Sequence, residues 1–393
     1  MKDSIFMRST NNFDANAPLQ GLRVIEFGQF IAAPAAAQTL ADLGAEVIKV
    51  ESPGGDAART VGWSRDAYGP MFTAYNRGKR SVVLDLRQAI DREQALKLAC
   101  SADIVLQNAR PGAMERQGLG ATALRALSPR LIYGQVSGFG QHGPASVRAG
   151  FDIAAQAESG MMSLNGEGGR DPVRVGFTVV DALAAQMLVT GVLAALVRRG
   201  VTGQGALIDV SLVDVAIGAL SNAWAEFHLS GKMPIRRGNG QPTVAPAAEV
   251  IPTLDGMVVV SAYTEDHFPK LCAAIGHPEL ASDLRFSRNQ GRVDNRPALL
   301  DVLGKAMGHM TSDQVCDLLA QAGVVAGAVR TMAQVRPGHA GVSPDLFVEV
   351  SAEGRASVQV PGMPMVIDGV RRSAGRLPAL GEHTQEVLAS LAS

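Results

Sequence analysis

Short apolar runs alternate with helical patterns along the first part of the chain. The runs that predict strands lie at 22–28, 46–52, 81–86, 103–108 and 131–137. The patterns that predict helices between them lie at 32–44, 91–102 and 121–129. Strands that alternate with helices indicate an α/β fold with a parallel, doubly wound sheet, whose ligands bind beyond the carboxyl ends of the strands. Functional residues are therefore expected in the loops that follow Phe27, Val50, Gln107 and Val136.

The pattern changes in the second part of the chain. A long apolar helix is predicted over 182–199, and a strand and a further helix follow it. The segment 236–250 is rich in Gly and Pro and has no periodicity, which is typical of a crossing between domains. A hairpin around 255–256 and helical stretches up to residue 320 then indicate a smaller α+β domain.

Composition and charge exclude several classes of protein. The 36 Lys and Arg residues balance 37 Asp and Glu, and no long basic block is present, so nucleic-acid binding is not expected. Charged residues make up 19% of the chain, below the roughly 25% of an average globular protein, which favours an oligomer whose subunits cover part of the surface. The seven histidines show no spacing typical of metal ligands, so no metal site is predicted.

The cysteines and the apolar segments indicate a cytoplasmic protein. Three cysteines without C-x-x-C spacing cannot form a disulfide framework, which suggests a reducing compartment. Residues 1–18 lack the apolar core of a signal peptide and are expected to form a disordered leader. The most apolar stretch, 179–197, is interrupted by Asp181, Gln186 and Thr190, so a buried helix is expected there rather than a membrane span.

A glycine-rich string follows the strand predicted at 131–137. Residues 138–143 match the dinucleotide fingerprint G-x-G-x-x-G, but Pro144 and an irregular segment follow where that fold requires a helix. We therefore expect either a glycine loop that covers a ligand or a plain turn. His142 within this string is the histidine that such a loop could bring to a reacting centre.

Basic residues cluster in the segment 76–81, which reads NRGKRS. The cluster is either a solvated turn or part of a phosphate clamp. Arg59, Asn108 and Arg110 lie on other loops of the predicted sheet and support the clamp. Cations that converge from several loops suit a polyanionic ligand such as coenzyme A.

Asp181 stands between β-like residues and a long apolar helix. Its side chain could cap the helix, by accepting hydrogen bonds from the first backbone N–H groups. A carboxylate at this place could also act as a nucleophile toward an activated acyl group, and the two roles are compatible. The other acidic residues near predicted loops, Glu51, Asp56 and Asp152, are expected to be structural.

Several long motifs, in the same order, resemble the class III CoA-transferases, a family that includes formyl-CoA transferase, carnitine CoA-transferase and the α-methylacyl-CoA racemases. The resemblance extends from LQGLRVIEFG to LGEHTQEVLASL. Its marks are LADLGAEVIKVESPGGDAAR, FTAYNRGKRSVVLDL, NARPGAMERQGLG, GFDIAAQAESGMMSLNG, PVRVGFTVVDALAAQ and TGQGALIDVSLVD. The resemblance implies an aspartate nucleophile, and the matching position is Asp181.

The resemblance also implies which residues bind the substrate. With the basic loops considered above, the expected CoA-binding residues are Ile31, Lys79, Asn108, Arg110, Arg116 and Ser137. The loop that stabilises the oxyanion is expected at 138–143, with Gly138, Gly140 and His142, or at the string from Gly238 and Gly240 to Pro242. Formyl-CoA transferase carries a Gln and an Arg where this chain has Ile31 and Ser52, which does not favour oxalate as the acceptor.

The resemblance further implies an architecture and a mechanism. A large Rossmann-like domain is expected from 19–230 with 335–393, a small α+β domain from 231–334, and two chains are expected to interlock into a homodimer. Asp181 would form a mixed anhydride and then an aspartyl-CoA thioester as CoA passes from an acyl-CoA to a small carboxylic acid. No cofactor is implied, because CoA thioesters are substrates.

The residue at position 151 distinguishes the racemase branch of the family from the transferase branch. Racemase members have a His in a G-H-D motif, whereas this chain reads Gly-Phe-Asp at 150–152. A phenyl ring cannot exchange a proton at the α-carbon, so the transferase branch is favoured. An acyl-CoA racemase or dehydratase and a noncatalytic acyl-CoA-binding protein remain the alternatives, and the acyl donor and acceptor acid are left open.

Overall fold

The computed structural model describes residues 14, 16–240, 247–262, 264–373 and 375–391. The chain forms two compact units. The large unit contains 1–161, 174–225 and 340–393, and the small unit contains 162–173 and 226–339. Both ends of the chain therefore contribute to the large unit.

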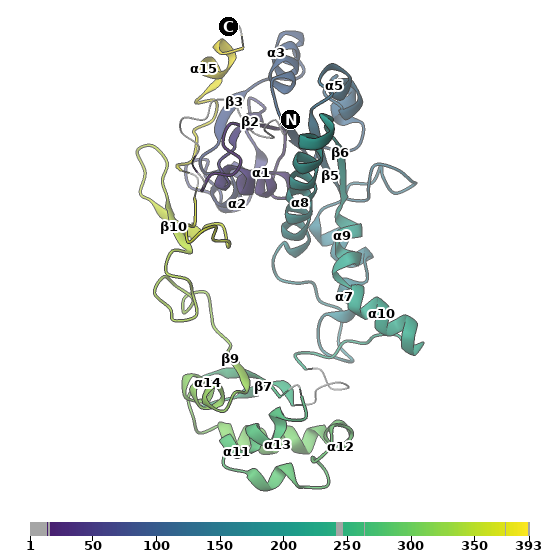
Figure 1. Ribbon diagram of the computed structural model, residues 1–393, viewed down its shortest axis with the longest axis vertical. Helices are drawn as coiled ribbons and strands as arrows, with labels where there is room; N and C mark the ends of the chain where they lie inside the picture. The colour runs from purple at the N-terminus through teal and green to yellow at the C-terminus, as the bar shows by residue number, and fades with distance from the viewer. Residues whose placement is uncertain (1–13, 15, 241–246, 263, 374, 392–393) are drawn as a thin grey trace. The chain divides into compact units, whose positions relative to one another are not determined.

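The large unit is built on a six-stranded parallel sheet (Figure 1). Its strands are β1 (Arg23–Glu26), β2 (Glu46–Glu51), β3 (Arg80–Val83), β4 (Ile104–Gln107), β5 (Ile132–Ser137) and β6 (Leu207–Ser211). Their order in the sheet is β3-β2-β1-β4-β5-β6, and every neighbouring pair is parallel. The doubly wound sheet predicted from the sequence is confirmed, and its order reverses between β1 and β4.

Helices cover both faces of this sheet because successive strand residues point to opposite faces. Val24 of β1 packs in a core with Leu40 of one helix and Leu188 of another, whereas Ile25 packs on the other face with Leu98 and Leu124. The helices and helical turns are α1 (Ala32–Asp42), η1 (Ala57–Arg59), α2 (Pro70–Tyr75), α3 (Ala89–Cys100), α4 (Ala113–Arg116), α5 (Ala121–Leu127), α6 (Asp152–Glu158), α7 (Met161–Leu164), α8 (Val179–Thr202), α9 (Leu212–Ala219), α10 (Ser221–Ser230) and α15 (Thr384–Ala389).

The helix α8 is long and apolar enough to cross a membrane, by length and composition alone. One face of it is buried, however, through residues such as Ala184, Leu188 and Val192, which join the core formed by α1 and the sheet. It is therefore packed as the central helix of the large unit, as the sequence predicts.

The small unit contains a three-stranded antiparallel sheet covered by helices. Its strands β7 (Ala248–Pro252), β8 (Met257–Ser261) and β9 (Val325–Ala328) lie in that order. The hairpin predicted around 255–256 joins β7 and β8. Its helices and helical turn are α11 (His267–Ala274), η2 (Pro278–Ala281), α12 (Asn289–Asp294), α13 (Arg296–Met307) and α14 (Ser312–Gln321). A separate antiparallel pair, β10 (Phe347–Val350) with β11 (Val358–Pro361), belongs to the large unit.

The boundaries of the units differ from the predicted ones in several places, including shifts of five residues at 226–230 and at 335–339. The segment 162–173 belongs to the small unit, where the Gly238 N–H donates to Gly166 O at 3.0 Å. Ala17, inside the predicted leader, is only 3% exposed and packs beside Gly44. Hydrogen bonds and packing over a large sequence separation set these boundaries, and local composition does not reveal them.

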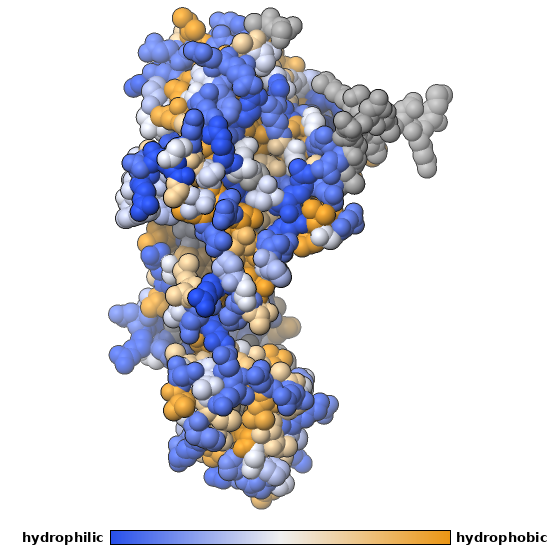
Figure 2. Space-filling view, turned by 90° about the vertical axis from the view of Figure 1, so that its left-hand side faces the viewer, coloured by the Kyte–Doolittle hydropathy of each residue, from blue (hydrophilic) through white to orange (hydrophobic). Residues whose placement is uncertain are grey.

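On the face shown in Figure 2, apolar residues lie among hydrophilic ones.

Candidate active site

The loops after β1 and β4 meet at the point where the strand order reverses. The Gln29 N–H donates to Asn108 Oδ1 at 2.9 Å, and Asn108 Nδ2 donates to Gln29 O at 2.8 Å. The Asn108 amide therefore ties the two loops together at the carboxyl edge of the sheet. This is where a doubly wound fold binds its ligands. Both ends of the Asn108 amide hold the loop in this structure, and its contact with CoA stays a prediction.

A buried ionic network lies beneath the loop that follows β1. Lys49 Nζ donates to Glu26 Oε1 at 2.9 Å and to Gly28 O at 2.7 Å. Lys79 Nζ donates to the other oxygen of Glu26 at 2.6 Å and to Pro34 O at 2.9 Å. All three charged side chains are fully buried. The network fixes the start of the loop from inside the protein.

Lys79, a predicted CoA-binding residue, is buried in this structure. Its ammonium group is enclosed by Glu26, Asn76 and Pro34 O and has no exposed surface. Burial lowers the pKa of Lys79 to about 8, because removing an ammonium ion from water disfavours its charged form. Lys79 thus supports the loop in this structure, and its contact with CoA stays a prediction.

The predicted phosphate clamp is wrong for Arg59. Its guanidinium group contacts both oxygens of Glu51, through Nε and one terminal nitrogen, each at 2.7 Å. The group is 3.7 Å from the centre of the Phe72 ring and is buried. Such a two-point ion pair leaves Arg59 in the interior, beside a Glu51 that is structural as expected.

The other cations of 76–81 are paired inside the large unit. Arg77 pairs with Asp42, and Arg80 pairs with Glu46. Together with Lys79 they account for all three cations of the segment. The segment is therefore an ionic anchor for β3 and not a clamp for phosphate.

Asp181 lies in the first turn of α8, three residues after Thr178, the residue at the N-cap position. The sequence-based expectation that Asp181 caps this helix is therefore wrong. The residue is half-buried. Burial raises the pKa of Asp181 to about 7, and the negative charge of Asp152 adds to the rise. An ionised Asp181 is thus a stronger base than an exposed carboxylate.

The glycine loop passes directly in front of α6. A Cβ atom on Gly138 would lie 2.6 Å from the Cα of Gly150, so only glycine allows this close approach. Gly150 is two residues before Asp152, whose carboxylate accepts hydrogen bonds from the backbone of α8 at Val180 and Asp181. The structure thus connects the predicted loop at 138–143 to the helix end that carries Asp181.

The loop after β1 approaches the same region through an aromatic contact. Phe30 has a left-handed backbone, with φ of 62°, and its N–H donates to Asp56 Oδ1 at 3.2 Å. Its ring meets the ring of Phe151 edge to face, with centroids 5.8 Å apart. Ile31, the next residue, is buried at the start of α1. Phe151 is 61% exposed, so its ring is available to a ligand.

Comparison with known proteins places this arrangement in a family. The profile of CoA-transferase family III matches residues 19–384. The chain belongs to CoA-transferase family III. It is 36% identical over 383 residues to succinyl-CoA–D-citramalate CoA-transferase from Chloroflexus aurantiacus, covering 95% of this chain and 94% of the relative. It is 33% identical over 390 residues to succinate–glutarate CoA-transferase from Agrobacterium fabrum, covering 95% and 96%.

Solved structures agree with this assignment. A CAIB/BAIF family protein from Brucella suis superposes with a TM-score of 0.84 at 35% identity, covering 96% of this chain and all of that one. Rv3272 from Mycobacterium tuberculosis has a TM-score of 0.81 at 36% identity, covering 94% and 99%. The resemblance found in the sequence motifs is confirmed.

Of the four remaining polar candidates of this CoA-transferase, three are exposed and one is buried. Arg110 and Arg116 are exposed and have no ion pair among the residues that the structure describes. Ser137, at the end of β5, has a buried Oγ without a hydrogen-bond partner in the described part of the chain. His142 is exposed within the glycine loop.

The second predicted oxyanion loop of the CoA-transferase belongs to the small unit. A Cβ on Gly238 would collide with the carboxylate of Glu167, and one on Gly240 would collide with the ion pair of Glu249 and Arg296. Both glycines therefore serve close packing within that unit. The neighbouring 241–242 of the predicted loop lie outside the described residues.

Tyr75, at the end of α2, is a residue near Asp181 that the sequence analysis did not select. Burial raises the pKa of the Tyr75 hydroxyl, and the negative charge of Asp181 adds to the rise. Tyr75 is therefore close enough to Asp181 for their charges to interact. A lone tyrosine before the NRGKRS segment carries no pattern that could have identified it.

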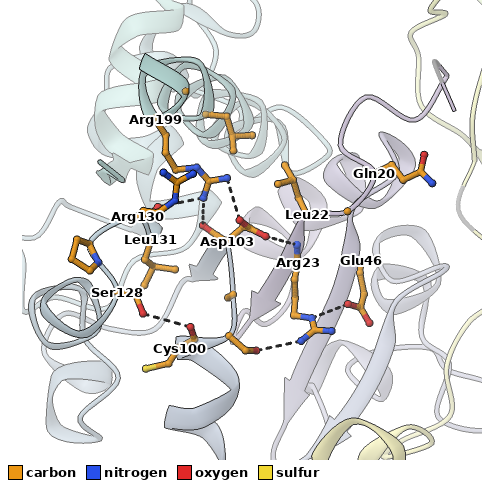
Figure 3. A pocket seen from close by; sticks show the side chains of 16 residues that line it. Gln20, Leu22, Arg23, Glu46, Cys100, Asp103, Ser128, Arg130, Leu131 and Arg199 are labelled. Atoms are coloured by element: carbon orange, nitrogen blue, oxygen red, sulfur yellow. Dashed lines mark hydrogen bonds and ion pairs between the residues drawn. The ribbon is translucent and has the colours of Figure 1, made fainter. Parts of the chain in front are cut away.

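A cavity of about 750 Å³ lies at the opposite, amino edge of the sheet (Figure 3). Its charged side chains are largely paired with each other. Arg23 Nε contacts Glu46 at 2.8 Å, and a terminal nitrogen of Arg199 contacts Asp103 at 3.2 Å. Because this cavity lies at the end of the strands away from Asp181, it is not the candidate active site of the CoA-transferase.

Proposed function

We propose that this protein transfers CoA from an acyl-CoA thioester to a small carboxylic acid through covalent intermediates on Asp181. The observation that carries the proposal is the half-buried Asp181 at the start of α8, whose N–H donates to Asp152, two residues after the Gly150 that packs against Gly138 of the glycine loop. The names of similar proteins include succinate, citramalate and glutarate, which supports small carboxylic acids as acceptors.

The proposed reaction proceeds through four acyl exchanges. Asp181 attacks the thioester carbonyl, so that the C–S bond breaks and a mixed anhydride and CoA thiolate form. The thiolate attacks the aspartyl carbonyl, which releases the donor acid and leaves an aspartyl-CoA thioester. The acceptor carboxylate then displaces the thiolate to form a second anhydride. Attack of the thiolate on the acceptor carbonyl releases the new thioester and restores Asp181.

Other residues of the large unit support these steps. Each carbonyl attack develops negative charge on oxygen, which backbone N–H groups of the loop 138–143 would stabilise. Gly140 has φ of 82°, a conformation that favours glycine and shapes this loop. The exposed Arg110 and Arg116 are proposed to bind CoA phosphates, and the Ser137 hydroxyl to donate to the substrate.

The function is tested by offering a panel of acyl-CoA donors with a panel of carboxylic acids. Mass spectrometry should detect a new acyl-CoA whose formation depends on both substrates and on the protein. Tight binding of acyl-CoA without any new thioester would instead support a noncatalytic binding protein.

The raised pKa of Asp181 predicts an unusual pH dependence. Only the ionised carboxylate can attack, so activity should be full at alkaline pH and be lost as the pH falls through the pKa of about 7. The rate profile of kcat/KM against pH should therefore show an acid limb centred near pH 7. A limb below about pH 4.5, close to the value of an ordinary aspartate, would contradict this environment for Asp181.

Phe151 predicts that the protein does not racemise its substrate. A phenyl ring has no proton to exchange, so a 2-methylacyl-CoA incubated in heavy water should retain its α-hydrogen while CoA transfer proceeds. The check is mass spectrometry of the recovered thioester. Deuterium uptake that depends on the enzyme and matches the rate of transfer would move the protein to the racemase branch.

The exposed face of α8 supports the proposed homodimer. Leu183, Met187, Val197 and Val201 lie on one stripe of this helix, and the last two are 70% and 80% exposed. An apolar stripe of this length is typical of a surface that another subunit covers. Because interlocked chains separate only by partial unfolding, light scattering at nanomolar concentration should find a dimer. A folded species near 41 kDa would contradict interlocking.

A further inference from the structure

The helix that carries Asp181 is capped by a residue from a different helix. Thr178, at the N-cap position of α8, makes no side-chain capping hydrogen bond. Asp152 of α6 supplies this cap, because its Oδ2 accepts from the N–H of Val180 at 2.7 Å and from the N–H of Asp181 at 3.2 Å. Helix N-termini need such acceptors, since their first N–H groups have no partner within the helix.

Gln156, one turn further along α6, fixes the orientation of Asp152. Its Nε2 donates to Asp152 Oδ1 at 2.6 Å, and its Oε1 accepts from the Val175 N–H at 2.8 Å. Gln156 is fully buried, and Asp152 is 3% exposed. The pair thus holds the backbone at both ends of the segment 175–181, which leads into the site.

Asp152 also places a negative charge beside Asp181. The charge of Asp152 on α6 acts on the ionisation of Asp181, and the charge of Asp181 acts on the ionisation of Tyr75 on α2. Among these two, Asp152 is the group that disfavours ionisation of Asp181. A carboxylate that ionises reluctantly is a better nucleophile once ionised.

We propose that Asp152 is a positioning residue for Asp181, whose backbone it holds through the cap and beside which it places a second negative charge. The inference rests on the proposed function. It differs from a purely structural role of Asp152, because it predicts an effect on the pH profile as well as on the rate.

The first test is Asp152→Asn. The neutral side chain can still accept from Val180, but its amide faces the Nε2 donor of Gln156, and the repulsion is gone. We expect kcat to fall by about a hundredfold, with KM for acyl-CoA changed less than about threefold, since misplacement affects the reacting group and not CoA binding. The acid limb of the pH profile should move to lower pH.

A second variant shows whether the loss of activity in the first comes from the lost hydrogen bonds or from misfolding. In Asp152→Asn with Gln156→Glu, the new carboxylate accepts from both the Asn amide and the Val175 N–H, so these two hydrogen bonds are restored, and only the long one from Gln156 to Phe177 O is lost. We expect kcat at least about tenfold above that of the single variant. The matched control is Glu93→Gln on α3, an exposed acid paired with Lys97, which should leave kcat and the pH profile unchanged.

The outcomes separate this inference from the proposed function. An Asp152→Asn protein with unchanged kcat and an unchanged acid limb would overturn the inference. A lower kcat with the acid limb unmoved, or no recovery in the double variant, would also overturn it. If Asp181→Asn retained transfer, the proposed function itself would fail, whatever the result at Asp152.

Discussion

Asp181→Asn should reduce CoA transfer by a factor of at least about a thousand while the fold survives. The amide has nearly the same shape as the carboxyl group but cannot attack a thioester to form an anhydride. No side-chain cap is lost, because Asp152 caps α8 through the backbone. The measurement is kcat/KM for an active donor and acceptor pair, with circular dichroism and light scattering to compare the folds.

The matched control for this loss is Asp301→Asn on α13. Asp301 is an exposed acid of the small unit that pairs with Lys305, so its neutralisation should leave the transfer rate unchanged. Near-normal transfer by Asp181→Asn, measured beside this control, would remove Asp181 from the mechanism.

The same Asp181→Asn variant should be more stable than the wild type at alkaline pH. The pKa of Asp181 is raised to about 7 in the folded protein and returns to its ordinary value of 3.8 on unfolding. The folded state therefore holds its proton longer, and stability falls as the pH rises between these two values. At about 1.4 kcal/mol per pH unit, the free energy that the variant recovers is up to about 4 kcal/mol above pH 7.

Denaturant unfolding at pH 5 and pH 8 measures this stabilisation. The advantage of Asp181→Asn over the wild type should be clearly larger at pH 8 than at pH 5, because the wild-type carboxyl group is ionised in the fold only at the higher pH. Lower stability of the variant at both values would instead show that the carboxyl group holds the helix end, as a cap would.

The alternation of strands and helices was sufficient to predict most of the fold. Apolar runs ending near Phe27 and Gln107 become neighbouring parallel strands, and the hairpin at 255–256 forms as its turn residues suggest. Periodicity is a local property, so it identifies each element. It does not show that 162–173 leaves the large unit, because that depends on contacts with residues near Gly238.

Asp181 is the one candidate site residue to which both local pattern and a family motif point, and its catalytic role stays a prediction. Asp181 could be found because it stands at a helix start that matches a family motif. The cations could not be assigned in the same way, because sequence shows charge but not burial: Lys79 and Arg59 both pair with glutamates inside the protein. The capping bond from Val180 to Asp152 joins residues that are 28 positions apart in the chain. The local sequence pattern cannot predict a contact over that separation.

Trapping the acylated enzyme tests the covalent role of Asp181 most directly. The protein is incubated with its acyl-CoA donor and then with hydroxylamine, which converts an activated aspartyl carbonyl into a hydroxamate. Peptide mass spectrometry should place the hydroxamate on Asp181 in the wild type and find none in Asp181→Asn. A hydroxamate on a different acidic residue, or none during active transfer, would contradict the account.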